Sequence, residues 1–234
     1  CGAEFSRWQG QCSACKAWNT ISEVRLISAS NSTKNDRFSG YAGETRAKIQ
    51  TLSEISLQET PRFTSGFKEL GGGIVPGSAI LIGGHPGAGK STLLLQVMCG
   101  LAKNMTALYV TGEESLQQVA MRANRLNLPT DKLNMLSETS VEQICNLADQ
   151  LKPQIIVVDS IQVMHLSDIQ SSPGSVAQVR ECASFLTRYA KTRQVAIIMV
   201  GHVTKDGTLA GPKVLEHAID CSLLLEGEAD SRFR

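Results

Sequence analysis

The chain has 234 residues, of which 42% are hydrophobic and 19% charged, and these values exclude an intrinsically disordered protein. The formal net charge is +1, so any contact with nucleic acid must come from local loops or from an assembled ring. No apolar stretch reaches the roughly 18 residues that a membrane span needs, and the first residues do not form a signal peptide, so we expect a cytoplasmic protein without membrane partners.

The first 15 residues contain three of the seven cysteines, and Cys12 and Cys15 form a C-x-x-C pair. Thiolates at this spacing suit a tetrahedral zinc ion, and Cys1 can supply a ligand from an opposing knuckle. The sequence shows no fourth ligand nearby, so we expect a cysteine that precedes residue 1 to complete the zinc site. A redox-active pair is the alternative. Trp8 and Trp18 are expected to pack around the knuckles or to stack on bases.

Composition divides the rest of the chain into a linker and a core. The stretch Ser28–Asp36 is rich in Ser, Asn and Thr and has no apolar period, which indicates a linker. After Pro61, strand-like and helix-like segments alternate, and this pattern predicts an α/β fold with a mainly parallel central sheet. We therefore expect a zinc finger over residues 1–20, a linker over 21–60 and the α/β core over 61–234.

Hydrophobic periodicity gives the expected elements of the core. Short apolar runs predict strands at Ala79–Ile82, Ala107–Thr111, Ile155–Asp159, Val195–Val200 and Cys221–Leu225. Apolar residues at helical spacing predict helices at Thr92–Leu101, Leu116–Leu126, Val141–Leu151 and Val176–Lys191.

Three details of these helices can be tested. The last helix has the clearest amphipathic pattern, with Val176 and Val179 on the expected buried face and Gln178 directed elsewhere. Ser140 followed by Gln143 predicts a capping box at the start of the third helix. The four cysteines that lie among apolar neighbours are expected in the core, namely Cys99, Cys145, Cys182 and Cys221.

The segment Gly84–Ser91 fits the phosphate-binding pattern G-x-x-x-x-G-K-[ST] at every fixed position, between a predicted strand and a predicted helix. Its glycines allow backbone N–H groups to face a phosphate, and the helix N-terminus adds partial positive charge. We expect Lys90 to reach the β- and γ-phosphate oxygens of ATP or ADP, and Ser91 to hold Mg²⁺. The predicted nucleotide-binding residues are Gly84, His85, Pro86, Gly87, Ala88, Gly89, Lys90, Ser91 and Thr92.

Acidic residues stand at or just past the ends of two predicted strands. Asp159 ends an apolar strand in the arrangement called Walker B and is expected to hold Mg²⁺ through water. Glu113 and Glu114 follow the strand that ends at Thr111, where strand ends converge on a ligand. We expect Glu113 to orient or activate the attacking water, with Glu114 as the second candidate. The alternative is that both carboxylates only begin the next helix.

The segment after Val200 carries a histidine and two lysines. His202 is expected beside the γ-phosphate, where it can report the nucleotide state to the following loop, although a histidine at a strand end can also be structural. Lys205 and Lys213 lie in a Gly-containing segment and can touch DNA phosphates. A solvated surface loop is the alternative for these two lysines.

Together these motifs resemble those of the bacterial RadA (Sms) family of recombination and repair ATPases. The resemblance covers nearly the whole chain and rests on the combination rather than on the phosphate loop alone. The matching segments are the cysteine finger with Trp8–Cys12 and Trp18–Thr20, Gly71–Gly73, Pro76–Ser78, the phosphate loop, Thr111–Ser115, Asp159–Gln162, Ser171–Ser175, Gln178–Glu181 and Gly201–Gly207.

The resemblance implies a RecA-like P-loop NTPase core that assembles as a homo-hexameric ring with DnaB-like helicase activity. It implies a DNA-stimulated ATP hydrolase that binds single-stranded and branched DNA, drives branch migration of recombination intermediates and interacts with the RecA recombinase. By analogy with RecA-like cores, Ser167–Val176 would form the first DNA-facing loop and Lys205–Lys213 the second. Glu113 matches the catalytic glutamate of the family, and His202 matches the position that senses the γ-phosphate.

The chain departs from the family pattern in three places. The first cysteine of the finger is missing, and the segment Glu69–Gly71 is a few residues shorter than the usual approach to the phosphate loop. The chain also ends at Arg234, before the Lys-Asn-Arg-Phe-Gly motif and the Lon-protease-like domain that RadA proteins carry. We expect trimmed residues to account for these differences.

Two other functions stay open from the residues alone. A KaiC-like signalling ring shares the core and the glutamate pair, but the zinc finger argues against it. A nucleotide-controlled adaptor would use the finger to grip a protein partner, with ATP setting only the oligomeric state.

Overall fold

The computed structural model describes residues 11, 15–16, 51, 53, 61–64, 72–202, 215 and 218–226. The chain divides into two compact units, Cys1–Asp36 and Arg37–Arg234. In the first unit the described residues are Gln11, Cys15 and Lys16, and the Gln11 side chain donates a hydrogen bond to the Lys16 carbonyl at 2.8 Å. The second unit contains the α/β fold.

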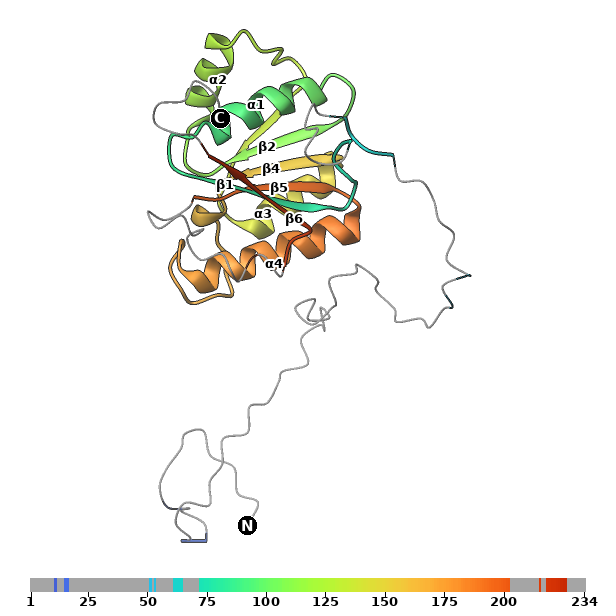
Figure 1. The fold of residues 1–234 in the computed structure, drawn as a ribbon. Helices are drawn as coiled ribbons and strands as arrows, with labels where there is room; N and C mark the ends of the chain where they lie inside the picture. The colour runs from blue at the N-terminus through green and yellow to red at the C-terminus, as the bar shows by residue number, and fades with distance from the viewer. Residues whose placement is uncertain are drawn as a thin grey trace. The chain divides into compact units, whose positions relative to one another are not determined.

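A fully parallel sheet forms the centre of the second unit (Figure 1). Within the described residues its strand order is β3-β2-β4-β5-β1-β6, and all five pairings are parallel. The predicted parallel α/β architecture is therefore confirmed. The strands are β1 (Ala79–Gly84), β2 (Ala107–Thr111), β3 (Asn134–Ser137), β4 (Ile155–Asp159), β5 (Ala196–Val200) and β6 (Cys221–Leu225).

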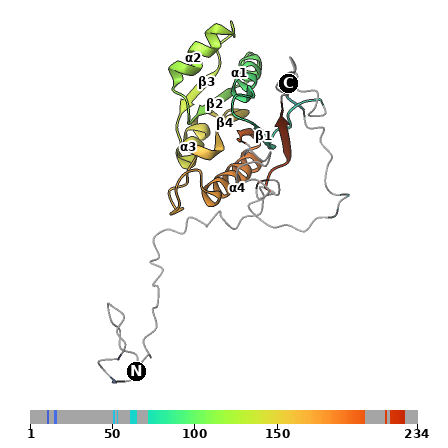
Figure 2. The same cartoon turned by 60° about the vertical axis from the view of Figure 1, so that its left-hand side comes forward.

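Helices cover both faces of the sheet (Figure 1 and Figure 2). On one face lie α1 (Lys90–Leu101) and α2 (Leu116–Arg125), and on the other lie α3 (Val141–Leu151) and α4 (Val176–Arg193). A short 3-10 helix, η4 (Ile161–Val163), follows β4. Successive side chains of each inner strand enter opposite layers, so the inner strands are buried on both sides, as a parallel sheet between helices requires.

The predicted elements are present, with ends that differ by at most two residues, and one strand was missed. The missed strand β3 has the sequence Asn-Met-Leu-Ser, which is short and contains no β-branched residue. It lies at the sheet edge and pairs only with β2 among the described strands. Pairing to a long-range neighbour, rather than local preference, makes this segment a strand.

The predicted capping box at Ser140 is only half correct. The Ser140 hydroxyl accepts a hydrogen bond from the Gln143 amide at 3.3 Å, as predicted. The Ser140 amide, however, donates to the Glu138 carboxylate at 2.9 Å rather than to the Gln143 side chain. A complete reciprocal box occurs instead at the start of α2, between Ser115 and Gln118.

Three of the four cysteines predicted for the core are fully buried, and the fourth is partly buried. Cys145 and Cys182 join the layer of α3 and α4, and Cys99 joins the layer of α1 and α2, against which Cys221 of β6 packs. In the described part of the chain, no helix has the length and apolar character that crossing a membrane demands.

The predicted buried face of α4 is wrong at its first turn, because Val176 is 56% exposed whereas Gln178 is 2% exposed. The Gln178 amide organises the preceding loop. Its oxygen accepts from the Leu166 amide at 3.1 Å, and its two N–H groups are shared among the Leu166, Ile169 and Ser171 carbonyls, which lie 3.3, 3.1 and 2.9 Å from the nitrogen. A buried amide that bonds four backbone groups stabilises the fold more at this position than an apolar side chain would, because it leaves fewer of these groups without a partner.

Replacing Gln178 by leucine is therefore expected to lower the free energy of unfolding by about 1–3 kcal/mol, because it leaves buried backbone groups without partners. Urea unfolding followed by circular dichroism measures this change. Gln170→Leu is the matched control, since Gln170 is exposed in the same loop. Equal stability of the two variants would contradict the role given to Gln178.

Candidate nucleotide-binding site

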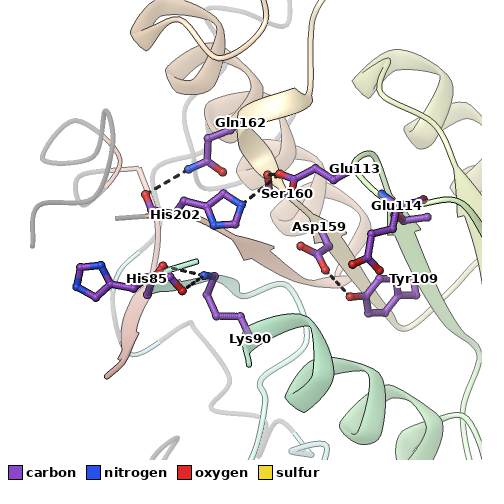
Figure 3. A network of polar contacts seen from close by, with 11 residues as sticks. His85, Lys90, Tyr109, Glu113, Glu114, Asp159, Ser160, Gln162 and His202 are labelled. Carbon is purple, nitrogen blue, oxygen red and sulfur yellow. Dashed lines mark hydrogen bonds and ion pairs between the residues drawn. The ribbon is translucent and has the colours of Figure 1, made fainter. Parts of the chain in front are cut away.

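The carboxyl ends of β1, β2, β4 and β5 bring the predicted ATPase residues to one edge of the sheet. Lys90 follows β1, Glu113 follows β2, Asp159 ends β4 and His202 follows β5. Figure 3 shows these four side chains directed toward a common region above the strand ends. Glu113 and His202, which are 89 positions apart in the chain, thus meet at the end of the sheet where α/β proteins bind their ligands.

The phosphate loop turns from β1 into α1 with backbone geometry that depends on glycine. A side chain at Gly84 would place its Cβ 2.6 Å from the Leu225 carbonyl oxygen of the neighbouring strand β6. Gly89 precedes α1 with φ of 95°, in the left-handed region, and no side chain caps the helix there. The N–H groups of the first turn of α1 are therefore available to an anion, and the loop fits a nucleotide phosphate.

Lys90 lies at the base of this loop and is 4% exposed. Its ammonium donates to the Gly84 carbonyl at 2.7 Å and to the His85 carbonyl at 3.0 Å. Burial lowers the pKa of Lys90, and the negative charges of Asp159 and Glu113 oppose that shift. The His85 imidazole points away from the ammonium (Figure 3), so the backbone of His85, rather than its ring, belongs to the loop.

Asp159 ends β4 within reach of the phosphate loop. Its Oδ2 accepts a hydrogen bond from the Tyr109 hydroxyl at 2.5 Å. Burial raises the pKa of Asp159, while hydrogen bonds from Tyr109 and from Ser91 lower it. The contact between Ser91 and Asp159 brings together the two oxygen donors predicted for Mg²⁺, and such hard oxygen ligands suit that ion.

Glu113 is held by two neighbours and stays accessible, with a side chain 39% exposed. The Ser160 hydroxyl donates to Glu113 Oε1, and His202 Nε2 lies 3.2 Å from the same oxygen. The hydrogen bond to His202 lowers the pKa of Glu113, while burial raises it and the Ser160 bond lowers it further. Glu113 is therefore a carboxylate at neutral pH, the form of this group that can accept a proton.

Glu114 has a different environment from that of its neighbour. Its carboxylate forms an ion pair with Arg122 of α2. Its backbone is fixed by Thr111, whose hydroxyl donates to the Glu114 carbonyl at 2.7 Å and accepts from the Glu114 amide at 3.1 Å. The two adjacent carboxylates thus separate, one toward the strand ends and one toward α2.

His202 lies at the end of β5, with its ring 31% exposed and in contact with Glu113. The Gln162 side chain of η4 donates to the His202 carbonyl at 3.5 Å (Figure 3). The structure therefore links the predicted γ-phosphate sensor both to a predicted catalytic carboxylate and to the segment that follows Asp159.

Among the side chains of this site that sequence reasoning missed are Tyr109, Ser160 and Arg122. Tyr109 gave a usable signal, because a tyrosine inside a buried strand needs a partner for its hydroxyl. Ser160 stands directly after the Walker B carboxylate. Arg122 gave no local signal beyond its position on α2, eight residues after Glu114.

Several predicted site residues lie outside the described residues. These are Cys1 and Cys12 of the expected zinc site and Lys205 and Lys213 of the expected second DNA-facing loop. Cys15 is described, and it is exposed. The roles of all five residues in binding zinc or DNA stay predictions.

Comparison with known protein families matches two parts of the chain. The profile of a family described as "AAA domain" matches residues 44–208, and that of a family described as "Rubredoxin metal binding domain" matches residues 1–23. The first match spans both the phosphate loop and the Walker B strand.

Comparison with individual proteins gives relatives over the whole chain. The chain is 92% identical to the DNA repair protein RadA of Haemophilus influenzae and 72% identical to that of Escherichia coli, and covers 52% of each. It therefore spans about half the length of the curated relatives it matches. A KaiC-like protein of Pyrococcus horikoshii has a similar fold, with a TM-score of 0.59 over 74% of this chain and 84% of that protein, at 19% identity.

Proposed function

Because the chain belongs to the RadA family of bacterial DNA repair proteins and carries an AAA domain, we propose that it is a DNA-stimulated ATPase motor in recombination. The motor would bind single-stranded and branched DNA, act as a hexameric ring and promote branch migration of recombination intermediates. The RecA recombinase is the proposed protein partner.

The observation that carries this proposal is the convergence of Lys90, Asp159 and Glu113 at one edge of the sheet. Lys90 would bind the β- and γ-phosphates from the base of the loop, while the N–H groups of α1 bind the remaining oxygens. Glu113 Oε2 would accept the proton of the attacking water. Glu114 is the weaker candidate for that role, because its carboxylate is paired with Arg122.

Mg²⁺ is the proposed metal cofactor, and Ser91 and Asp159 are the residues that would hold it. When bound, the ion neutralises charge on the phosphate oxygens and orients them. Ser91 acts directly and Asp159 through water in this proposal. Burial raises the pKa of Asp159, and the hydrogen bonds from Tyr109 and Ser91 oppose that shift, so these two donors support the charged form that the role requires.

His202 is the proposed link between nucleotide and DNA. Its ring contacts Glu113, and a γ-phosphate at the loop would offer the ring a second, negatively charged partner. The chain after His202 leads directly into the segment of Lys205 and Lys213, which are the proposed DNA-phosphate contacts. Ser167–Val176, organised by Gln178, is the proposed first DNA-facing loop.

Zinc bound by Cys1, Cys12 and Cys15 is the proposed role of the N-terminal segment. The match of residues 1–23 to a family described as a metal-binding domain supports a metal there. The C-x-x-C spacing favours zinc.

Fluorescence anisotropy of a labelled single-stranded oligonucleotide tests the motor proposal. We expect tight binding with a non-hydrolysable ATP analogue and weaker binding with ADP or without nucleotide. Raising the salt concentration should weaken binding, because phosphate contacts release counterions. If protein that binds nucleotide and forms rings binds no oligonucleotide in any nucleotide state, the DNA motor is contradicted and the signalling or adaptor function is favoured.

A further inference from the structure

We propose that Tyr109 is a positioning residue for ATP hydrolysis: its hydroxyl holds Oδ2 of Asp159, so that Oδ1 stays directed toward the cation site. This inference rests on the proposed role of Asp159 in holding Mg²⁺. Tyr109 does not touch the nucleotide or the cation in this arrangement, and acts only through Asp159.

The sheet register brings the two residues together. Tyr109 pairs with Val157 across the strands β2 and β4, and Thr111 pairs with Asp159. Since side chains alternate between the two faces of a strand, Tyr109 and Asp159 are diagonal neighbours on the same face. That face is the one covered by α1, the helix whose first turn contains Ser91.

Burial makes the contact a fixed one. Tyr109 is 1% exposed, and its ring belongs to the cluster formed with residues of α1 and α2. A buried hydroxyl needs a partner, and the 2.5 Å distance to Asp159 Oδ2 is that of a short, charge-assisted hydrogen bond. The ring cannot move away without leaving its packing, so the carboxylate is anchored to the rigid centre of the sheet.

The Lys90 ammonium is a competing partner for Asp159, and the hydrogen bond from Tyr109 keeps the two groups from pairing. The negative charge of Asp159 attracts the Lys90 ammonium, which lies at the base of the same loop. A carboxylate free to rotate could turn toward Lys90 and neutralise the group that the phosphates need. With Tyr109 on Oδ2 and Ser91 as a second donor, Asp159 is held away from that pairing.

Tyr109→Phe tests the inference, because it removes one oxygen and keeps the ring and its packing. The chain offers a matched control in Tyr189→Phe. Tyr189 of α4 also donates to an aspartate, Asp149 Oδ1, at 2.9 Å. This pair lies in the layer opposite to α1, near the ends of α3 and α4 that lead into β4 and β5. Both variants lose one tyrosine–aspartate hydrogen bond, and only one of them borders the proposed site.

The rate of ATP hydrolysis is measured at saturating ATP over a range of Mg²⁺ concentrations, together with binding of a fluorescent ATP analogue in EDTA. For Tyr109→Phe we expect the half-saturating Mg²⁺ concentration to rise about tenfold, as is common when a group that orients a metal ligand is lost. Binding of the analogue without cation should stay unchanged, because the phosphate loop is intact. Tyr189→Phe should match the parent in both measurements.

An unchanged Mg²⁺ dependence in Tyr109→Phe, or an equal change in both variants, would overturn the inference. Thermal unfolding shows whether either variant has lost its structure. If Tyr109→Phe is unfolded, the same titration of Tyr109→His decides instead, because the shorter imidazole ring does not reach Asp159 Oδ2 and this hydrogen bond is again lost: a Mg²⁺ dependence like that of the parent would overturn the inference. A parent whose hydrolysis did not depend on Mg²⁺ would overturn the proposed role of Asp159, which separates failure of that function from failure of this inference alone.

Discussion

Lys90→Ala is expected to reduce ATP hydrolysis by at least about 100-fold and to weaken ATP binding, because it removes the buried cation at the base of the phosphate loop. Among the described residues of the loop, Lys90 is the one lysine or arginine side chain, so none can replace its charge. Its ammonium is bound to the Gly84 and His85 carbonyls. Steady-state hydrolysis and titration with a fluorescent ATP analogue measure the two effects.

Lys103→Ala is the matched control, because Lys103 is an exposed lysine just beyond the far end of α1. It should hydrolyse ATP at the parent rate. If Lys90→Ala also hydrolysed ATP at the parent rate, the assignment of the nucleotide site would be wrong. Loss of activity in both variants, with unfolding, would point to damage of α1 rather than of the site.

Glu113→Gln is expected to lower the hydrolysis rate at saturating ATP by roughly 10²–10⁴-fold while nucleotide binding is retained, because a neutral amide cannot accept the proton of the attacking water. Glu114→Gln should lower the rate far less, since its carboxylate is paired with Arg122 on α2. Single-turnover hydrolysis with pre-bound ATP separates this step from binding.

Glu181→Gln serves as the control for this pair, because Glu181 forms an exposed ion pair with Arg180 on α4. Its hydrolysis rate should equal that of the parent. A larger loss in Glu114→Gln than in Glu113→Gln would reverse the roles given to the two glutamates. Equal and small losses would contradict a carboxylate base at this edge of the sheet.

Local sequence pattern was enough for most of the fold. Apolar runs and helical spacing predicted five strands and four helices to within two residues at their ends, because these elements depend on periodicities of two and 3.6 residues that are visible in the chain itself. The exception, β3, has no such pattern. It became a strand because β2 offers it a backbone partner.

The phosphate loop was also visible in the sequence, since its function resides in consecutive residues from Gly84 to Ser91. Its environment was not. The reason for glycine at position 84 includes the Leu225 carbonyl, which comes from a strand far along the chain. The burial of Gln178, likewise, depends on a loop that folds back over the start of α4.

The sequence by itself determined the fold class, the phosphate loop and the family, because each depends on local patterns or on the order of motifs along the chain. Only the tertiary structure decided which carboxylate faces which partner. Glu113 and Glu114 are adjacent in sequence, yet one meets His202 and the other Arg122. Tyr109 and Asp159 are 50 residues apart and meet because β2 and β4 are neighbours in the sheet, an order that no local pattern contains.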